Sequence, residues 1–285
     1  MSRASLLLPA LLIVTLAHAQ ESEEKKYGWF FTAEFSAVWT AGNSESRTFG
    51  LGSTVRRVWP TSTLKFEAGG TRTESTLTTR TAVGTSPNDF KVRTEEKTEK
   101  TAELFYVRGR YDHQVGGSFF VFGGSDWLRN RFAGIDSRFL LALGVGNSWL
   151  DRETLRFKTD ASATYTFQTD VIPNPATADK FGGVRLAYDF WWQLTESTDF
   201  TSVLTVDWNL NNTKDVRFDY TNAFTVAISK TLAFKPSLQL LWRNDPALTR
   251  VPLLAPDGSA TGETVLVPLQ KLDTLFTVSL VVRLQ

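Results

Sequence analysis

Cysteine is absent from this 285-residue chain, and histidine occurs only twice, as His18 and His113. Without cysteine the protein forms no disulfide, has no thiolate ligand for zinc and carries no cysteine for a lipoprotein anchor. Two histidines far apart in the sequence give no histidine cluster for zinc or copper. We therefore expect no metal site and no bound cofactor.

The chain also has little net charge and almost no long apolar run. Its formal net charge is +1 and its mean hydropathy is −0.16, which gives no reason to expect a nucleic-acid partner. After the N-terminus, no stretch approaches the roughly 20 apolar residues that a spanning helix needs, so a helical membrane protein is excluded. A membrane barrel is not excluded, because its strands alternate apolar and polar residues.

The one apolar run lies at the N-terminus. Arg3 precedes residues 6–16, which are apolar almost throughout, and the small-residue motif AHA follows at 17–19. This order of basic, apolar and small residues is typical of a secretory signal peptide. We predict a signal peptide over residues 1–19, a short periplasmic leader over 20–28 and one barrel domain over 29–285.

Alternation of apolar and polar residues dominates the rest of the chain. In the stretch TLRFKTDASATYTF, residues 154–167, the odd positions are apolar except Thr159 and the even positions are all polar. Side chains of a strand point alternately to its two faces, so this is a strand with one apolar and one strongly polar face. In a soluble sandwich the apolar face would be the core, whereas in an outer-membrane barrel it would face lipid.

Twelve such segments follow one another, each about 10–13 residues long, whereas ordinary strands average about 5–6 residues and membrane-spanning strands need about 9–11. The segments are 29–41, 48–59, 63–73, 101–111, 118–127, 138–149, 154–167, 183–194, 200–210, 216–228, 232–242 and 272–284. Most of the connections alternate between short turns and longer polar loops, of which 74–100 and 243–271 are the longest. Short periplasmic turns and longer external loops are typical of outer-membrane barrels, and twelve strands place both termini on the periplasmic side.

Tryptophan is concentrated at the ends of these segments, as two interfacial belts require. The predicted interface aromatics are Trp39, Trp127, Trp208 and Trp242 at the external end and Trp29, Trp59, Trp149 and Trp192 at the periplasmic end. Trp191 is expected near the periplasmic end too. The pattern predicts an all-β protein: a transmembrane antiparallel up-and-down β-barrel of about 12 strands. A soluble all-β sandwich is the alternative.

The face opposite to the apolar one carries charges of both signs. The predicted lumen-lining residues are Glu34, Arg56, Lys65, Glu67, Glu103, Arg138, Arg156, Lys158, Asp160, Arg185, Asp189, Asp207, Arg217, Asp219, Lys235, Arg243, Asp273 and Arg283. Ten cations and eight anions on one surface favour an ion-paired, hydrated lumen over an active site. A narrow charged lumen would also suit a channel for ions or small solutes.

The stretch DWLRNRFAGIDSRFLLALGVGNSWL, residues 126–150, resembles the family known as domain of unknown function 481, which includes proteins named as salt-induced outer-membrane proteins. The features that carry the resemblance are the aromatic and basic run 127–132, the motif FAGIDSR, the pair Gly144 and Gly146, and the early GNSES. Asn130 stands where the resemblance leads us to expect an acidic residue. The resemblance implies an outer-membrane β-barrel and brings no established activity or catalytic residues.

Catalytic residues are not evident, and we expect no enzymatic activity. Ester hydrolysis needs a nucleophile activated by a base, and the one histidine beyond the signal peptide, His113, is predicted in a short periplasmic turn. The acidic residues in loops 86–100 and 255–263 lack the ligand spacing of known calcium loops. An outer-membrane lipid hydrolase therefore remains a minor alternative, and it requires a serine and a carboxylate beside His113.

The sequence favours a structural or envelope-stress role that allows passive permeation of small solutes, with a dedicated small-solute or ion channel as the alternative. We expect a monomer in the outer membrane of a Gram-negative bacterium. The expected partners are outer-membrane lipid and lipopolysaccharide, with barrel-assembly machinery and periplasmic chaperones during biogenesis, and no nucleic acid. Barrels of this kind commonly end in an aromatic residue, whereas this chain ends in Leu284 and Gln285.

Overall fold

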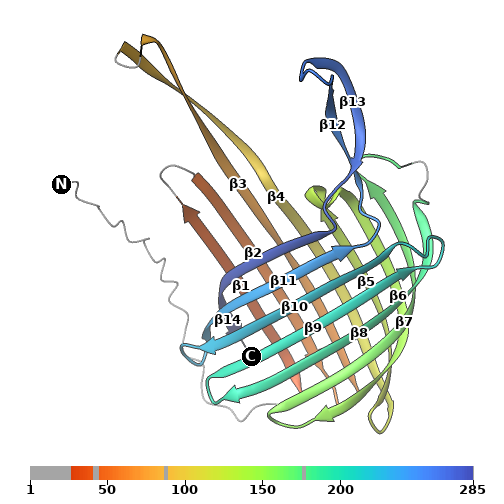
Figure 1. The fold of residues 1–285 in the computed structure, drawn as a ribbon. Coiled ribbons are helices and arrows are strands. Elements are labelled where there is room, and N and C mark those ends of the chain that lie inside the picture. The colour runs from red at the N-terminus through yellow and green to blue at the C-terminus, as the bar shows by residue number, and fades with distance from the viewer. Residues whose placement is uncertain (1–26, 41–44, 87–88, 175–177, 285) are drawn as a thin grey trace.

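The computed structural model describes residues 27–40, 45–86, 89–174 and 178–284. The predicted signal peptide and nearly all of the predicted leader lie outside the described residues. Twelve strands form a closed barrel, in the order β1-β14-β11-β10-β9-β8-β7-β6-β5-β4-β3-β2 (Figure 1). The barrel strands are β1 (Gly28–Thr40), β2 (Glu45–Val58), β3 (Ser62–Ser86), β4 (Asp89–Gly116), β5 (Phe119–Asn130), β6 (Ile135–Asp151), β7 (Leu155–Asp170), β8 (Lys180–Thr195), β9 (Thr198–Asn209), β10 (Val216–Ala227), β11 (Leu232–Arg243) and β14 (Leu272–Leu284).

The barrel closes where the first strand meets the last. β1 pairs antiparallel with β14, with Phe31 opposite Leu284 and Phe35 opposite Leu280, and on its other side it pairs with β2. All the other neighbours in the ring are antiparallel as well, so no barrel strand is left with an open edge over its paired length. The prediction of an all-β, twelve-stranded antiparallel barrel is confirmed, and the soluble sandwich is not the fold.

Burial along the strands shows which face lies inside. On β7 the polar residues Ser162 and Thr166 are only 5% and 2% exposed, whereas Tyr165 between them is 46% exposed. On the neighbouring β6, Leu143 is 74% exposed. The apolar face therefore points out of the barrel, where a membrane supplies the apolar surroundings, and the polar face points into the lumen.

The two ends of the barrel differ. The end at which β2–β3, β4–β5, β6–β7, β8–β9 and β10–β11 connect has short turns and is called the turn end below; the opposite end is called the loop end. At the loop end β3 and β4 continue beyond the barrel as a long hairpin, and β12 (Leu248–Leu254) and β13 (Ala260–Pro268) form a second one (Figure 1). The segments 74–100 and 243–271, predicted as long polar loops, thus contain paired strands over much of their length. Hydroxyl pairs such as Thr76 Oγ1 to Thr98 Oγ1, at 2.8 Å, support the first hairpin.

A one-turn helix, η1 (Arg131–Ala133), joins β5 to β6 at the loop end. The side chain of Asn130, which stands where an acidic residue was expected, accepts a hydrogen bond from the Ala133 amide at 3.1 Å and caps this turn. The next residue, Gly134, has φ of 75° and ends it. Within the described ranges, no helix has the length and apolar character needed to cross a membrane.

Candidate functional site: the lumen

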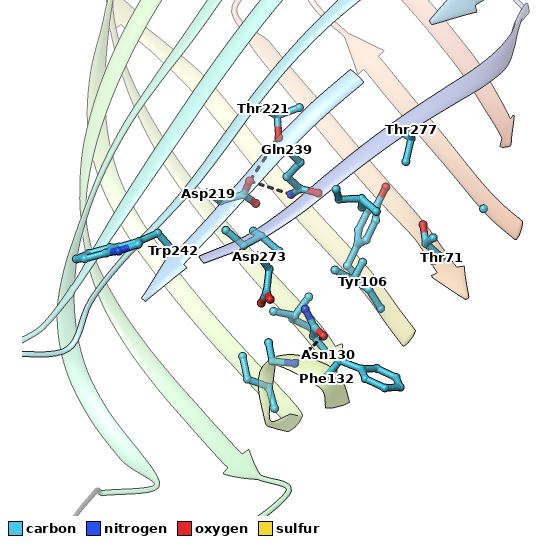
Figure 2. A pocket seen from close by; sticks show the side chains of 18 of the residues that line it. Thr71, Tyr106, Asn130, Phe132, Asp219, Thr221, Gln239, Trp242, Asp273 and Thr277 are labelled. Atoms are coloured by element: carbon cyan, nitrogen blue, oxygen red, sulfur yellow. Dashed lines mark hydrogen bonds between the residues drawn. The ribbon is translucent and has the colours of Figure 1, made fainter. Parts of the chain in front are cut away.

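A cavity of about 400 Å³ occupies the loop-end half of the lumen. Strands β1, β2, β3, β11 and β14 line it with glycine and small polar side chains, including Gly52, Thr71, Ser237 and Thr277. A larger side chain at these positions would fill the space, so the small residues on this wall are the local reason that the cavity exists. In Figure 2, Thr71, Tyr106, Asp219, Gln239 and Asp273 surround the hollow.

Charged side chains also line the cavity, and one ion pair spans the lumen. The guanidinium of Arg108 on β4 lies 3.4 Å from Asp126 on β5 and 3.6 Å from Asp219 on β10. Because β4 and β10 are six places apart in a ring of twelve, the contact between Arg108 and Asp219 joins opposite sides of the barrel. Arg185 extends the network, with hydrogen bonds of 2.7 and 2.9 Å to Asp207 and a contact of 3.9 Å to Asp126.

A second group of charges lies at the loop-end rim, around Asp215 in the connection between β9 and β10. Arg217 hydrogen-bonds to this carboxylate and to Gln168, and Arg243 lies 3.1 Å from it. Burial alone would raise the pKa of Asp215, but the guanidinium groups of Arg217 and Arg243 outweigh it and lower the pKa to about 2. The Asp215 carboxylate therefore stays ionised at neutral pH.

Towards the turn end, the lumen contains a further layer of ion pairs. The pairs are Arg110 with Asp112 and Asp160 at 2.7 and 2.9 Å, Lys65 with Glu67 at 2.8 Å, Lys158 with Asp189 at 3.7 Å, and Arg283 with Asp199 at 3.5 Å. The guanidinium of Arg110 also lies over the ring of Phe122, 3.6 Å from its centroid. Below this layer a hollow of about 570 Å³ opens at the turn end.

The structure places nearly every predicted lumen charge on the inner face. The residues found there are Glu34, Arg56, Lys65, Glu67, Arg138, Arg156, Lys158, Asp160, Arg185, Asp189, Asp207, Arg217, Asp219, Lys235, Arg243, Asp273 and Arg283. Two of them form an ion pair between strands: Lys235 Nζ on β11 lies 2.6 Å from Glu34 Oε1 on β1.

Glu103 is the exception, and its placement in the lumen is wrong. It shares the face of Phe105 and Val107, which are 39% and 50% exposed on the outside of β4, while Tyr106 and Arg108 line the cavity. Glu103 instead contacts Lys100 at 3.5 Å near the loop-end rim. Near the rim the outer face of the strand no longer lies in the apolar layer, so a charged side chain such as that of Glu103 can point outwards there.

Several luminal charges escaped the sequence analysis: Arg108, Arg110, Asp112, Asp126, Asp199 and Asp215. The first three lie in a segment with apolar residues on both faces, which obscured its register. A usable signal was present, since Arg108, Arg110 and Asp112 alternate with Val107, Gly109 and Tyr111. If these three charges, rather than Glu103, are assigned to the lumen, the alternation along the segment gives the inner face that the structure shows.

The tryptophans lie near strand ends, with most of their exposed rings on the outer surface. Trp29, Trp59, Trp149 and Trp192 are found at the turn end and are between 38% and 62% exposed. At the loop end Trp127, Trp208 and Trp242 lie within a few residues of their strand ends, and Trp242 stacks on Phe218. The backbone of Trp39 ends β1, but its side chain lies outside the described part of the structure. Trp191 faces the lumen.

His113 lies within β4 and not in a turn, because the strand continues to Gly116. Its Nδ1 is 2.9 Å from Ser62 Oγ, and the hydroxyl of Tyr111 donates to the same oxygen at 3.0 Å. No carboxylate hydrogen-bonds to His113 among the residues that the structure describes, so the group that would orient a catalytic histidine is missing there. Over the same residues, no cluster of three histidine, cysteine or acidic residues could hold a metal ion.

The family described as "Protein of unknown function, DUF481" matches residues 33–283. The chain belongs to this family. One DUF481-like relative is the uncharacterised protein YdiY of Escherichia coli strain K12, which is 26% identical over 155 residues, or 54% of this chain. The matched segment spans 58% of the length of YdiY.

Solved structures of outer-membrane barrels resemble this DUF481 protein in overall architecture. A NanC porin covers 90% of this chain and 98% of its own, at 8% identity and a TM-score of 0.43. A bacterial polysaccharide outer-membrane secretin covers 90% of this chain and 96% of its own, at 8% identity and a TM-score of 0.39. Such likenesses concern the barrel alone, and the chain is a twelve-stranded β-barrel of a family that is described as one of unknown function.

Proposed function

We propose that this DUF481 barrel is a narrow channel for small polar solutes. The observation that carries the proposal is the cavity of about 400 Å³ in the lumen, which has glycine and hydroxyl side chains on one wall. A barrel of purely structural function has no need of such a space, and eight-stranded barrels fill theirs with side chains. Twelve strands enclose a wider lumen, which is here only partly filled.

Ion pairs set the width of the proposed path. The contacts of Arg108 with Asp126 and Asp219 divide the lumen near the cavity floor, and the layer around Arg110 and Asp160 lies below. Solutes must pass beside these side chains, so we expect small unitary conductance. Charged groups at a constriction select among ions and small solutes by their sign and size.

The test is a planar-bilayer recording of purified protein. Replacing Arg108 and Asp219 together by alanine shortens both partners of the cross-lumen pair and leaves neither unpaired, so we expect larger unitary conductance than in the wild type. Glu74→Gln serves as the control, because Glu74 pairs with Arg72 on the outer side of the β2–β3 wall. Absence of conductance steps in both the wild type and the double variant would contradict the channel.

The remaining expectations stay predictions. We propose that residues 1–19 are a cleaved signal peptide, which the mass of the mature N-terminus would test, and that the turn end faces the periplasm. From the sequence we also propose that the protein contacts lipopolysaccharide and outer-membrane lipid, and that barrel-assembly machinery and periplasmic chaperones act during its biogenesis. We further propose that it is a monomer without enzymatic activity. A structural or envelope-stress role would be favoured if the bilayer recordings gave no channel.

A further inference from the structure

Two luminal arginines near the turn end have no acidic partner. Arg56 on β2 lies over the ring of Phe30, with its Cζ 4.8 Å from the ring centroid, and Arg156 on β7 lies over Trp191 at 4.0 Å. Neither forms an ion pair within 4 Å in the described part of the chain. An aromatic face attracts and orients a guanidinium, but it does not neutralise the charge.

The acids of the same layer are already engaged by other cations. Glu67 pairs with Lys65, Asp189 with Lys158, and Asp199 with Arg283, while Asp112 and Asp160 both pair with Arg110. The layer therefore holds six cations and five acids, so one positive charge is in excess, and Arg56 and Arg156 are its two cations without an ion pair among the described residues.

The two arginines belong to distant parts of the barrel wall, and both point into the lumen near the turn end. Strands β2 and β7 are five places apart in the ring of twelve, and Arg156 is the main positively charged neighbour of Arg56. The acid whose charge acts on Arg56 is Asp189, which Lys158 already contacts at 3.7 Å. Like charges that converge in a confined space without a counter-ion favour the entry of a mobile anion.

We propose that Arg56 and Arg156 form a binding site for small anions, such as chloride or phosphate, at the turn end of the lumen and make the channel anion-selective. The selectivity part of this inference rests on the proposed channel function; the binding site does not. Guanidinium N–H groups held flat against aromatic rings keep their edges free for an anion, and arginine is well suited to oxyanions.

The first experiment measures the reversal potential of the channel in a potassium chloride gradient. We expect the wild type to pass chloride in preference to potassium, and the ratio to fall several-fold in the variant carrying Arg56→Gln and Arg156→Gln. Arg57→Gln is the matched control, because Arg57 is the next residue of the same strand and lies over Trp29 and Trp59 on the outer surface. It removes one positive charge beside Arg56, on the other side of the wall, and should leave the ratio unchanged.

The second experiment measures anion binding without conductance, as the rise in thermal unfolding temperature of the detergent-solubilised protein with increasing phosphate. The rise should occur in the wild type and in Arg57→Gln and be lost in the double variant. Cation selectivity in the wild type, or an unchanged ratio in the double variant, would overturn the selectivity. An equal phosphate effect in all three proteins would overturn the site. If no current flows but the phosphate effect follows the expected pattern, the channel fails and the anion site stands.

Discussion

Ala161 on β7 tests which side of the barrel wall faces lipid. Its side chain is exposed on the outer face at mid-strand, so Ala161→Lys places a charge in the apolar layer and should lower the free energy of unfolding by roughly 2–4 kcal/mol. The measurement is urea unfolding of the protein refolded into lipid vesicles. The adjacent Ser162 is a poor control, because it is 5% exposed and tightly packed inside.

Ser237→Lys is the better control for this test, since Ser237 is at mid-strand in β11 and lines the luminal cavity, where water and the Glu34 carboxylate are accessible. We expect this variant to unfold with nearly the wild-type free energy. Equal losses at Ala161 and Ser237 would mean that the outer face of the barrel does not contact lipid.

Asp215 gives the stability of the loop-end rim a defined pH dependence. Its pKa is lowered from about 3.8, the ordinary value for an aspartate, to about 2 in the folded protein. Its pairing with Arg217 and Arg243 therefore stabilises the fold above about pH 4, and this stabilisation is lost as the pH falls through about 2. Asp215→Asn should therefore lower the free energy of unfolding at pH 7 by about 2 kcal/mol or more. The difference from the wild type should shrink between pH 4 and pH 2. A difference that is constant over this range would contradict the role of ionised Asp215.

At the scale of elements, the two loop-end connections hold each other in place. A Cβ atom at Gly134, after η1, would lie 2.3 Å from the Cβ of Ala247 at the base of the β12–β13 hairpin, and the φ of Gly134 is 75°. Gly134→Ala should therefore push the hairpin base away and destabilise the fold by about 1–3 kcal/mol. The local readout is hydrogen exchange of the Leu269 amide, which donates to the Ala247 carbonyl at 2.9 Å and should exchange faster.

Gly258→Ala separates this contact from backbone strain. Gly258 lies in the β12–β13 turn at a φ of 85°, but a Cβ there would meet no atom within 4 Å. It carries the same conformational cost without the collision, so the exchange of the Leu269 amide should stay at its wild-type rate. Faster exchange in both variants would indicate strain alone as the cause.

At the scale of the whole molecule, the closed ring predicts how the protein behaves in detergent. Hydrogen bonds between β1 and β14 leave no free edge in the ring, so the barrel should resist sodium dodecyl sulfate until it is heated. We expect the unheated protein to migrate faster than the boiled protein on a gel, and extraction from membranes to require detergent. Identical migration before and after boiling would contradict a closed, stable barrel.

The twelve barrel strands and their two faces could be predicted from the sequence alone. Each strand has its own period-two pattern, as in residues 154–167, and a pattern of this kind is local, so it can be read without knowledge of any partner. The pairs within one strand, such as Lys65 with Glu67, were likewise accessible because residues two apart share a face.

Which distant charges meet could not be predicted from the sequence, because it depends on how the strands are arranged around the ring. Ring closure and the relative heights of the strands bring Arg108 of β4 to Asp219 of β10, and they leave Arg56 and Arg156 without an acid. The face of Glu103 was also settled this way, because its segment carries apolar residues on both sides. Contacts across a lumen depend on the stagger and tilt of all twelve strands together, and no local pattern records those quantities.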